Sequence, residues 1–198
     1  MAEPFTMFRS RIVPIAAENV DTDQIVPARY LKVTDKDGLA EALFHDWRFT
    51  EDGAQKDPPF VIDRPEMAGR AILLAGDNFG AGSSREHAPW ALVAFGVRAV
   101  ISTGFADIFR SNALKNGLLP VTVDGSTHAT LLAAPGAEVT IDLGERSLQL
   151  ADRARATFPI DPFARYCLMN GVDELSFLLS RDAAITAHES GPLPWRRS

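Results

Sequence analysis

The chain has 198 residues, of which 46% are hydrophobic and 23% charged, and its formal net charge is −6 at pH 7. At about 100–200 residues per domain, this length predicts a single domain with its own core. The acidic balance argues against a nucleic-acid-binding protein. The longest apolar run, 90–95, is far shorter than the ~20 residues that a membrane-spanning helix needs, so we expect no membrane partner.

The cysteine and histidine content limits the chemistry that this chain can perform alone. Cys167 is its only cysteine, which excludes intrachain disulfides, multi-cysteine zinc sites and a self-held iron–sulfur cluster. No two histidines have metal-ligand spacing, so we expect no metal or cofactor to be bound by this chain. Cys167 is predicted to be a small buried apolar side chain. No signal peptide is visible at the N-terminus, and we expect a cytoplasmic location.

The first third of the chain begins with a β-like segment at 7–17, which runs into a polar turn at 18–23. The apolar spacing over 39–47 predicts a helix, and 51–59 is a polar loop containing two prolines. The wholly apolar run at 71–75 predicts a strand that is buried on both faces.

Strand and helix patterns alternate through the middle of the chain. After the strand at 71–75, a helix is predicted at 84–96, a strand at 97–102, a helix at 105–116 and a strand at 118–123. This order predicts parallel strands joined by right-handed crossovers.

The last third combines a hairpin with a helical tail. Segments 138–143 and 147–151 are predicted to be antiparallel arms around Gly144. Asp161-Pro162 is typical of a helix start, and we predict one domain over 1–198 with a helical extension from about 161. The buried face of this tail is predicted to carry three leucines: Leu175, Leu178 and Leu179.

The loop at 76–87, with the sequence GDNFGAGSSREH, is the most informative stretch. Its glycines permit positive φ angles and close approach of another group to the backbone. Ser83 and Glu86 match a capping box, which predicts that Ser83 lies at or near the start of the following helix. Unpaired amides at a helix start attract anions, and Arg85 adds a planar fork that can bind a carboxylate through two hydrogen bonds.

Taken alone, this loop also fits an ordinary capped helix without chemistry, and Arg85 is the feature that favours binding. A nucleotide site is less well supported, because the loop lacks Gly-Lys-Ser/Thr and has Arg85 where a third glycine would fall. A small polycarboxylate is the better match. Two other polar stretches, 19–24 and 105–113, fit a turn and an amphipathic helix equally well.

Together these motifs resemble a known family. GSSREHA at 82–88, FADIF at 105–109 and NGLLP at 116–120 resemble the swivelling domain of the aconitase superfamily. NVDTDQI at 19–25 and LFHDWRF at 43–49 are closer to the bacterial-type small subunits of 3-isopropylmalate dehydratase. The resemblance covers roughly residues 5–180.

The resemblance implies an α/β fold, namely a three-layer β/β/α swivelling domain with a mixed parallel and antiparallel sheet. It implies a hydro-lyase that interconverts 2-isopropylmalate and 3-isopropylmalate through isopropylmaleate, in leucine biosynthesis. The partner would be a large subunit whose three cysteines hold a [4Fe-4S] cluster. Alternatives are the small subunit of a homoaconitase-like enzyme or of a citraconate/maleate hydratase, or a non-catalytic anion-binding module.

By the same resemblance, Ser83 is the catalytic base that removes the proton next to a carboxylate. Substrate-binding positions are Gly82, Ser84 and Arg85, while Leu31 and Val33 are candidates for an apolar wall around the branched alkyl group. Two residues, Thr22 and Asp23, match positions that support the part of the site lying on the partner.

Overall fold

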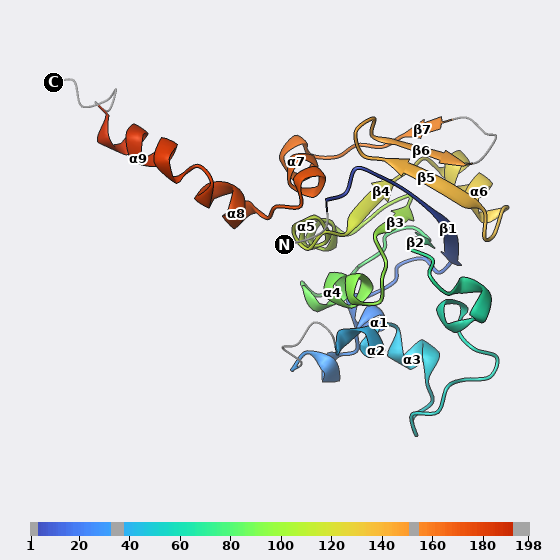
Figure 1. Ribbon diagram of the computed structural model, residues 1–198. Helices are drawn as coiled ribbons and strands as arrows, with labels where there is room; N and C mark the ends of the chain where they lie inside the picture. Colours follow the sequence, from blue (N-terminus) through green and yellow to red (C-terminus); the bar gives the residue numbers. More distant parts are fainter. Residues whose placement is uncertain (1–3, 33–37, 151–154, 192–198) are drawn as a thin grey trace.

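The computed structural model describes residues 4–32, 38–150 and 155–191. Within them the strands form one seven-stranded sheet, in the order β4-β3-β2-β1-β5-β6-β7 (Figure 1). The strands are β1 (Met7–Ile15), β2 (Ile72–Ala75), β3 (Ala99–Ser102), β4 (Leu119–Thr122), β5 (Glu138–Asp142), β6 (Ser147–Leu150) and β7 (Arg155–Thr157). All strands predicted from the sequence are present; β7 was not predicted.

The sheet is mixed, as expected. Strands β1 to β4 are parallel, with Val13 of β1 opposite Leu73 of β2, and β5 to β7 continue from β1 as antiparallel neighbours. The helices of the described residues are α1 (Thr22–Ile25), α2 (Leu39–Ala42), α3 (His45–Arg48), α4 (His87–Ala94), α5 (Asp107–Lys115), α6 (Gly125–Leu132), α7 (Pro162–Asn170), α8 (Glu174–Leu179) and α9 (Asp182–Ser190). The same residues also form the short 3₁₀ helices η1 (Ala28–Tyr30), η2 (Val61–Asp63) and η3 (Pro65–Met67).

Both faces of the parallel strands are covered, which explains their uninterrupted apolar sequences. Successive side chains of a strand point to opposite faces of the sheet. Leu73 and Ala75 of β2 belong to a core shared with helices α1 to α5, whereas Ile72 and Leu74 belong to a second core shared with β5, β6 and α6. The molecule therefore has helices on one side of the parallel strands and the antiparallel arm on the other, as expected for a β/β/α domain.

The predicted helix over 39–47 is two short helices instead of one. Phe44 separates α2 from α3 and has a left-handed backbone conformation with φ of 47°. Its fully buried ring stacks on Trp47 with ring centroids 5.1 Å apart, and its amide donates to Ile25 O at 2.7 Å. Tertiary contacts of Phe44 thus override the helical pattern of the sequence.

The prediction of a buried leucine face on the C-terminal helices is wrong. Leu175, Leu178 and Leu179 are 65%, 53% and 65% exposed. Helices α8 and α9 extend away from the body of the molecule (Figure 1), so no described element covers this face. A one-sided apolar pattern predicts an amphipathic helix but does not identify what covers the helix.

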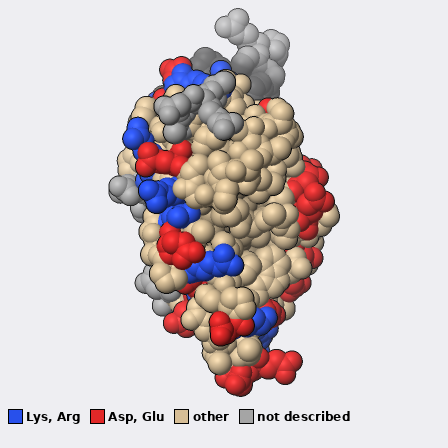
Figure 2. Space-filling view, turned by 90° about the vertical axis from the view of Figure 1, so that its right-hand side faces the viewer, with Lys and Arg blue, Asp and Glu red and all other residues tan. Residues whose placement is uncertain are grey.

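The surface carries charges of both signs. On the face drawn in Figure 2, blue and red side chains are interspersed along one margin, and the basic ones form no continuous patch. Among the helices that the structure describes, none is long and apolar enough to cross a bilayer.

Candidate active site

Three loops meet at the carboxyl ends of β1, β2 and β3. Asp21, after β1, forms a parallel bridge with Ala81, after β2, and Phe79 forms another with Phe105, after β3. The amide of Thr22 donates to Ala81 O at 2.8 Å. Ligands of open α/β sheets commonly bind outside this edge. The pairing brings the 19–25 and 82–88 motifs together.

Two of the loop glycines have specific steric roles. At Gly80 (φ +80°), an added Cβ would lie 2.2 Å from Phe109 Cγ, because the backbone passes directly over that buried ring. At Gly82 (φ +88°), an added Cβ would lie 2.5 Å from Asp21 Oδ2. Both glycines therefore allow close packing of this loop, and at Gly82 the neighbour is a carboxylate of the same chain.

Ser83 does not cap the helix that follows it. Helix α4 begins at His87 and its N-cap is Glu86, and no side chain of the described residues caps it. Ser83 lies earlier in the loop, where its carbonyl accepts a hydrogen bond from Thr22 Oγ1 at 3.0 Å. This tie to α1 keeps Ser83 outside the helix and explains why the predicted helix start at 84 is wrong.

The capping box occurs at α1 instead. The Asp21 side chain accepts from Asp23 N, and the Gln24 side chain accepts from Asp21 N at 2.8 Å. The sequence signal was present, since Asp21 and Gln24 have the capping-box spacing. Asp21 is thus a residue of this region that the sequence analysis missed, and it fixes the orientation of α1.

Ser83 and Ser84 are exposed, and Arg85 is half-buried. Among the described residues, none of the backbone hydrogen bonds uses the amides of these three residues as donors. Consecutive free amides can bind an anion where the backbone turns them toward one point. The loop therefore offers two hydroxyls and several backbone donors to solvent, beside a guanidinium group.

The Arg85 guanidinium is held by Asp23 through both terminal nitrogens. Nη2 donates to Asp23 Oδ2 at 2.7 Å, Nη1 donates to Asp23 Oδ1, and Nη1 also donates to Val26 O at 3.4 Å. The side chain of Arg85 is 12% exposed and that of Asp23 is 50% exposed. Asp23, which the resemblance assigned to the partner's part of the site, uses both carboxylate oxygens on Arg85 of its own chain.

This arrangement leaves one edge of the guanidinium open. An arginine has five N–H donors, and Asp23 and Val26 take three of them. The Nε–H and the second Nη2–H have no acceptor among the described residues. These two donors form a second fork, which fits a carboxylate.

The other predicted site residues have different settings. Thr22 is buried, and its hydroxyl holds Ser83. Leu31 follows η1 and is half-buried, while Val33 lies outside the described residues. The structure therefore brings Thr22, Asp23 and Arg85 together with the serines, and within the described part of the chain no hydrogen bond joins Leu31 to them.

The described residues contain no group of three or more histidine, cysteine, aspartate or glutamate side chains that could hold a metal ion. Cys167 is 8% exposed, in agreement with its predicted burial. Burial raises the pKa of its thiol, so the thiolate that a metal prefers is disfavoured.

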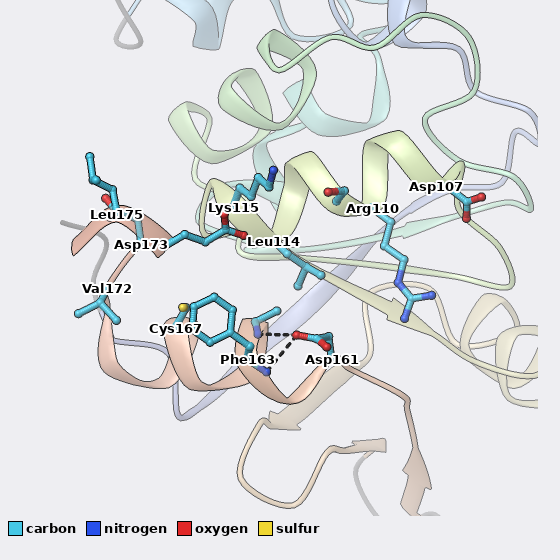
Figure 3. Close-up of a pocket in the computed structure, with 13 residues that line it drawn as sticks. Asp107, Arg110, Leu114, Lys115, Asp161, Phe163, Cys167, Val172, Asp173 and Leu175 are labelled. Carbon is cyan, nitrogen blue, oxygen red and sulfur yellow. Dashed lines mark hydrogen bonds between the residues drawn. The ribbon is translucent and has the colours of Figure 1, made fainter. Parts of the chain in front are cut away.

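A separate cavity of about 520 Å³ lies between α5, α7 and α8 (Figure 3). Leu114, Phe163 and Cys167 contribute its apolar surface, and charged residues such as Arg110 surround it. Asp161 at its border accepts from the amides of Phe163 and Ala164, so this carboxylate caps α7. None of the predicted site residues that the structure describes lines this cavity.

Comparison with known proteins identifies relatives of this chain. Residues 2–126 match the aconitase C-terminal domain family. The chain is 64% identical over 189 residues to the 3-isopropylmalate dehydratase small subunit of Anaeromyxobacter dehalogenans (strain 2CP-C), covering 96% of this chain and 98% of that protein. It is 55% identical to the small subunit of Roseiflexus sp. (strain RS-1), covering 95% and 94%.

A solved structure shows the same fold. The crystal structure of 3-isopropylmalate dehydratase from Methanocaldococcus jannaschii matches with a TM-score of 0.68 and 26% identity, covering 92% of this chain and 99% of that one. The fold is thus that of an aconitase C-terminal domain. Within that class, the chain belongs to the family of 3-isopropylmalate dehydratase small subunits.

Proposed function

We propose that this chain supplies the base and one carboxylate-binding group of a 3-isopropylmalate dehydratase, which interconverts 2- and 3-isopropylmalate through isopropylmaleate. The observation that carries the proposal is the open Nε/Nη2 fork of Arg85, next in the loop to the exposed Ser83 and Ser84. A hydroxy-diacid needs both features, a cation for a carboxylate and a base for the proton next to it.

Ser83 is assigned as the base. A serine hydroxyl is a poor base unless the environment stabilises its alkoxide, and preorganised N–H donors with a nearby guanidinium supply that stabilisation. The free amides of this loop and Arg85 are the groups available for it. Ser83 would take the proton from the substrate carbon as the C–O bond of the neighbouring carbon breaks, so that the hydroxyl leaves and isopropylmaleate forms. It would return the proton when water adds again across the double bond, at the other carbon.

Arg85 is assigned to one substrate carboxylate through its open fork, with the Ser84 hydroxyl and the backbone at Gly82 as further contacts. Asp23 is a positioning residue, because it holds the guanidinium by the terminal nitrogens and leaves the side edge free. Thr22 positions Ser83, because the Thr22 hydroxyl donates a hydrogen bond to the Ser83 carbonyl. Leu31 and Val33 remain our candidates for the wall around the isopropyl group.

The small-subunit names of the relatives imply a large-subunit partner. The family implies a [4Fe-4S] cluster in the enzyme, and the residues of this chain do not fit it, because the one cysteine is buried and disfavours its thiolate. We therefore assign the cluster to the large subunit, which would dock over the exposed serine loop. We expect the complex to act in the cytoplasm, in leucine biosynthesis.

The test is co-expression of this chain with a large subunit, followed by an anaerobic assay on 2-isopropylmalate. Ser83→Ala is expected to lower kcat by about 10²–10⁴-fold, the usual contribution of a positioned base, without loss of complex formation. Ser111→Ala is the matched control, since that exposed serine lies on α5 at the separate cavity.

Turnover of Ser83→Ala at the wild-type rate would refute the assignment of the base. A wild-type complex that prefers citraconate would point to the hydratase alternative. A complex that binds isopropylmalate without converting it would support a non-catalytic anion-binding module.

A further inference from the structure

The LFHDWRF motif at 43–49 has no role in the site proposed above, although it is one of the most specific parts of the resemblance. The structure places its charged residues on two sides of the short helix α3. Arg48 faces the body of the molecule, and His45 with Asp46 faces η1. Each side makes a different set of contacts.

Arg48 anchors α3 to the body. Its Nε donates to both oxygens of Asp63, at 3.1 and 2.9 Å. Its Nη1 donates to the carbonyls of Ala40, within α2, and of Leu43, the C-cap of α2. The side chains of Arg48 and Asp63 are each 10% exposed. These contacts hold α3 in a fixed position relative to α2 and η2.

The opposite side of α3 holds Arg29, which lies in η1. Arg29 Nη2 donates to His45 Nδ1 at 2.9 Å, and its two terminal nitrogens bind both carboxylate oxygens of Asp46. The guanidinium lies 4.9 Å from the ring centroid of Tyr30, and Tyr30 packs on His45 with centroids 5.0 Å apart. Ionic and aromatic contacts together fix η1 on α3.

The position of η1 makes this attachment relevant to the site. Pro27 is the N-cap of η1, and Val26, the residue before it, accepts a hydrogen bond from Arg85. Leu31 follows η1 directly. The short segment 26–31 thus connects the carboxylate fork to the predicted alkyl wall, and its middle is attached to α3.

We propose that Arg29, His45 and Asp46 form a positioning cluster that sets the distance between the Arg85 fork and Leu31, and thereby the preference for a branched alkyl substituent. The inference rests on the proposed function. An exposed ion pair contributes little to folding, whereas a shift of the segment that it holds changes the shape of the binding site. The cluster should therefore affect substrate selectivity far more than stability.

The experiment measures kcat and KM of the complex with the large subunit for two substrates, 3-isopropylmalate and 3-methylmalate, which has methyl in place of isopropyl. Since one or two methyl groups determine the discrimination, Asp46→Asn is expected to raise KM for 3-isopropylmalate by about threefold to tenfold. For 3-methylmalate we expect both constants within about twofold of wild type, because the alkyl wall contributes little to the smaller substrate.

Arg29→Gln provides the second variant, and it should change selectivity in the same way. The double variant Arg29→Gln/Asp46→Asn should be no worse than either single one, because both remove the same contact. Glu138→Gln is the matched control, since Glu138 forms the exposed ion pair with Arg9 between β1 and β5. It should leave the selectivity unchanged.

Equal changes for both substrates, unchanged selectivity, or additive effects in the double variant would each overturn the inference. These outcomes are distinguishable from failure of the proposed function, in which the wild-type complex would not convert isopropylmalate at all. An active wild type with an inactive Ser83→Ala and an unaltered Asp46→Asn would reject the positioning cluster alone.

Discussion

Two arginine–aspartate pairs of this chain have the same chemistry and opposite settings. Arg48 and Asp63 are both 10% exposed and lie between α3 and η2. Arg85 is similarly buried, but its partner Asp23 is 50% exposed and lies beyond the carboxyl ends of the central strands. The first pair joins two elements within the fold, and the second faces the solvent from which a substrate arrives.

The donor inventory of each guanidinium explains the difference. All three nitrogens of Arg48 bind Asp63 or carbonyls of the α2 segment. Arg85 retains an open fork at Nε and Nη2. A guanidinium whose three nitrogens all bind the protein stabilises the fold, whereas one that keeps an adjacent pair of N–H donors free, at Nε and Nη2, can bind a ligand. Substitutions in the two pairs should therefore affect stability and activity differently.

The largest effect on folding is expected for Arg48→Met. Removing one partner of a buried ion pair leaves an uncompensated charge and costs about 3–5 kcal/mol. Asp63 and the carbonyls of Ala40 and Leu43 would all lose their donor. Urea unfolding of the full chain measures the change, and a loss below ~1 kcal/mol would contradict a structural role for this pair.

Arg85→Lys should lower activity strongly and change stability little, the reverse of what is expected for Arg48→Met. Lysine keeps the charge but lacks the fork, so kcat/KM for isopropylmalate should fall by an amount equivalent to ~2–5 kcal/mol if a desolvated carboxylate binds there. The free energy of unfolding should change by less than ~1 kcal/mol, because Asp23 is half-exposed. An unchanged kcat/KM together with lower stability would make Arg85 another structural arginine.

Asp23→Asn sharpens the comparison further. The amide can accept only one of the two bonds that the carboxylate accepts, so the guanidinium would be less firmly oriented. We expect kcat/KM to fall about fivefold, equivalent to the ~1 kcal/mol of one hydrogen bond. Asp107→Asn is the control, since Asp107 is also exposed. Higher activity in Asp23→Asn would mean that Asp23 competes with the substrate for Arg85.

Local sequence patterns predicted most of the strands and several of the helices. The strands could be predicted because both faces are buried, and the start of α7 because Asp161 caps it at Phe163 and Ala164. Helix α6 was not predicted, since its first turn of Gly125, Ser126 and Thr127 consists of weak helix formers held by the Asp124 cap. The three residues of β7 are too few to show a periodicity.

The candidate site was only partly predictable. The loop and its residue types were visible in the sequence, but Asp23 and Arg85 are 62 positions apart and meet only because β1 and β2 are parallel neighbours. The same is true of Thr22, whose bond to Ser83 displaces the start of α4. Pairing of distant loops decides such contacts, and no local pattern shows it.

The third pair, Arg29 and Asp46, should have the smallest effect on folding. Hydrogen bonds from Arg29 hold the pKa of Asp46 below its ordinary value of 3.8, against a smaller opposing effect of burial. Because the folded-state pKa is depressed, the contribution of this pair is fully present above pH ~4 and is lost as the pH falls through the lower folded-state pKa. Both side chains are more than half exposed, so the contribution is at most about 1 kcal/mol.

Urea unfolding of wild type and Asp46→Asn at three pH values tests this sign, with pH 6 and pH 4.5 above the ordinary pKa of 3.8 and pH 3.5 below it. The wild type should be slightly more stable at pH 6, and the difference should shrink at pH 3.5, where the unfolded chain already binds the proton that the folded ion pair resists. A difference that grows on acidification would mean that the Asp46 carboxylate is not stabilised by Arg29. A difference of several kcal/mol at pH 6 would place this pair with Arg48 and Asp63 instead, as part of the fold rather than as a support for the site.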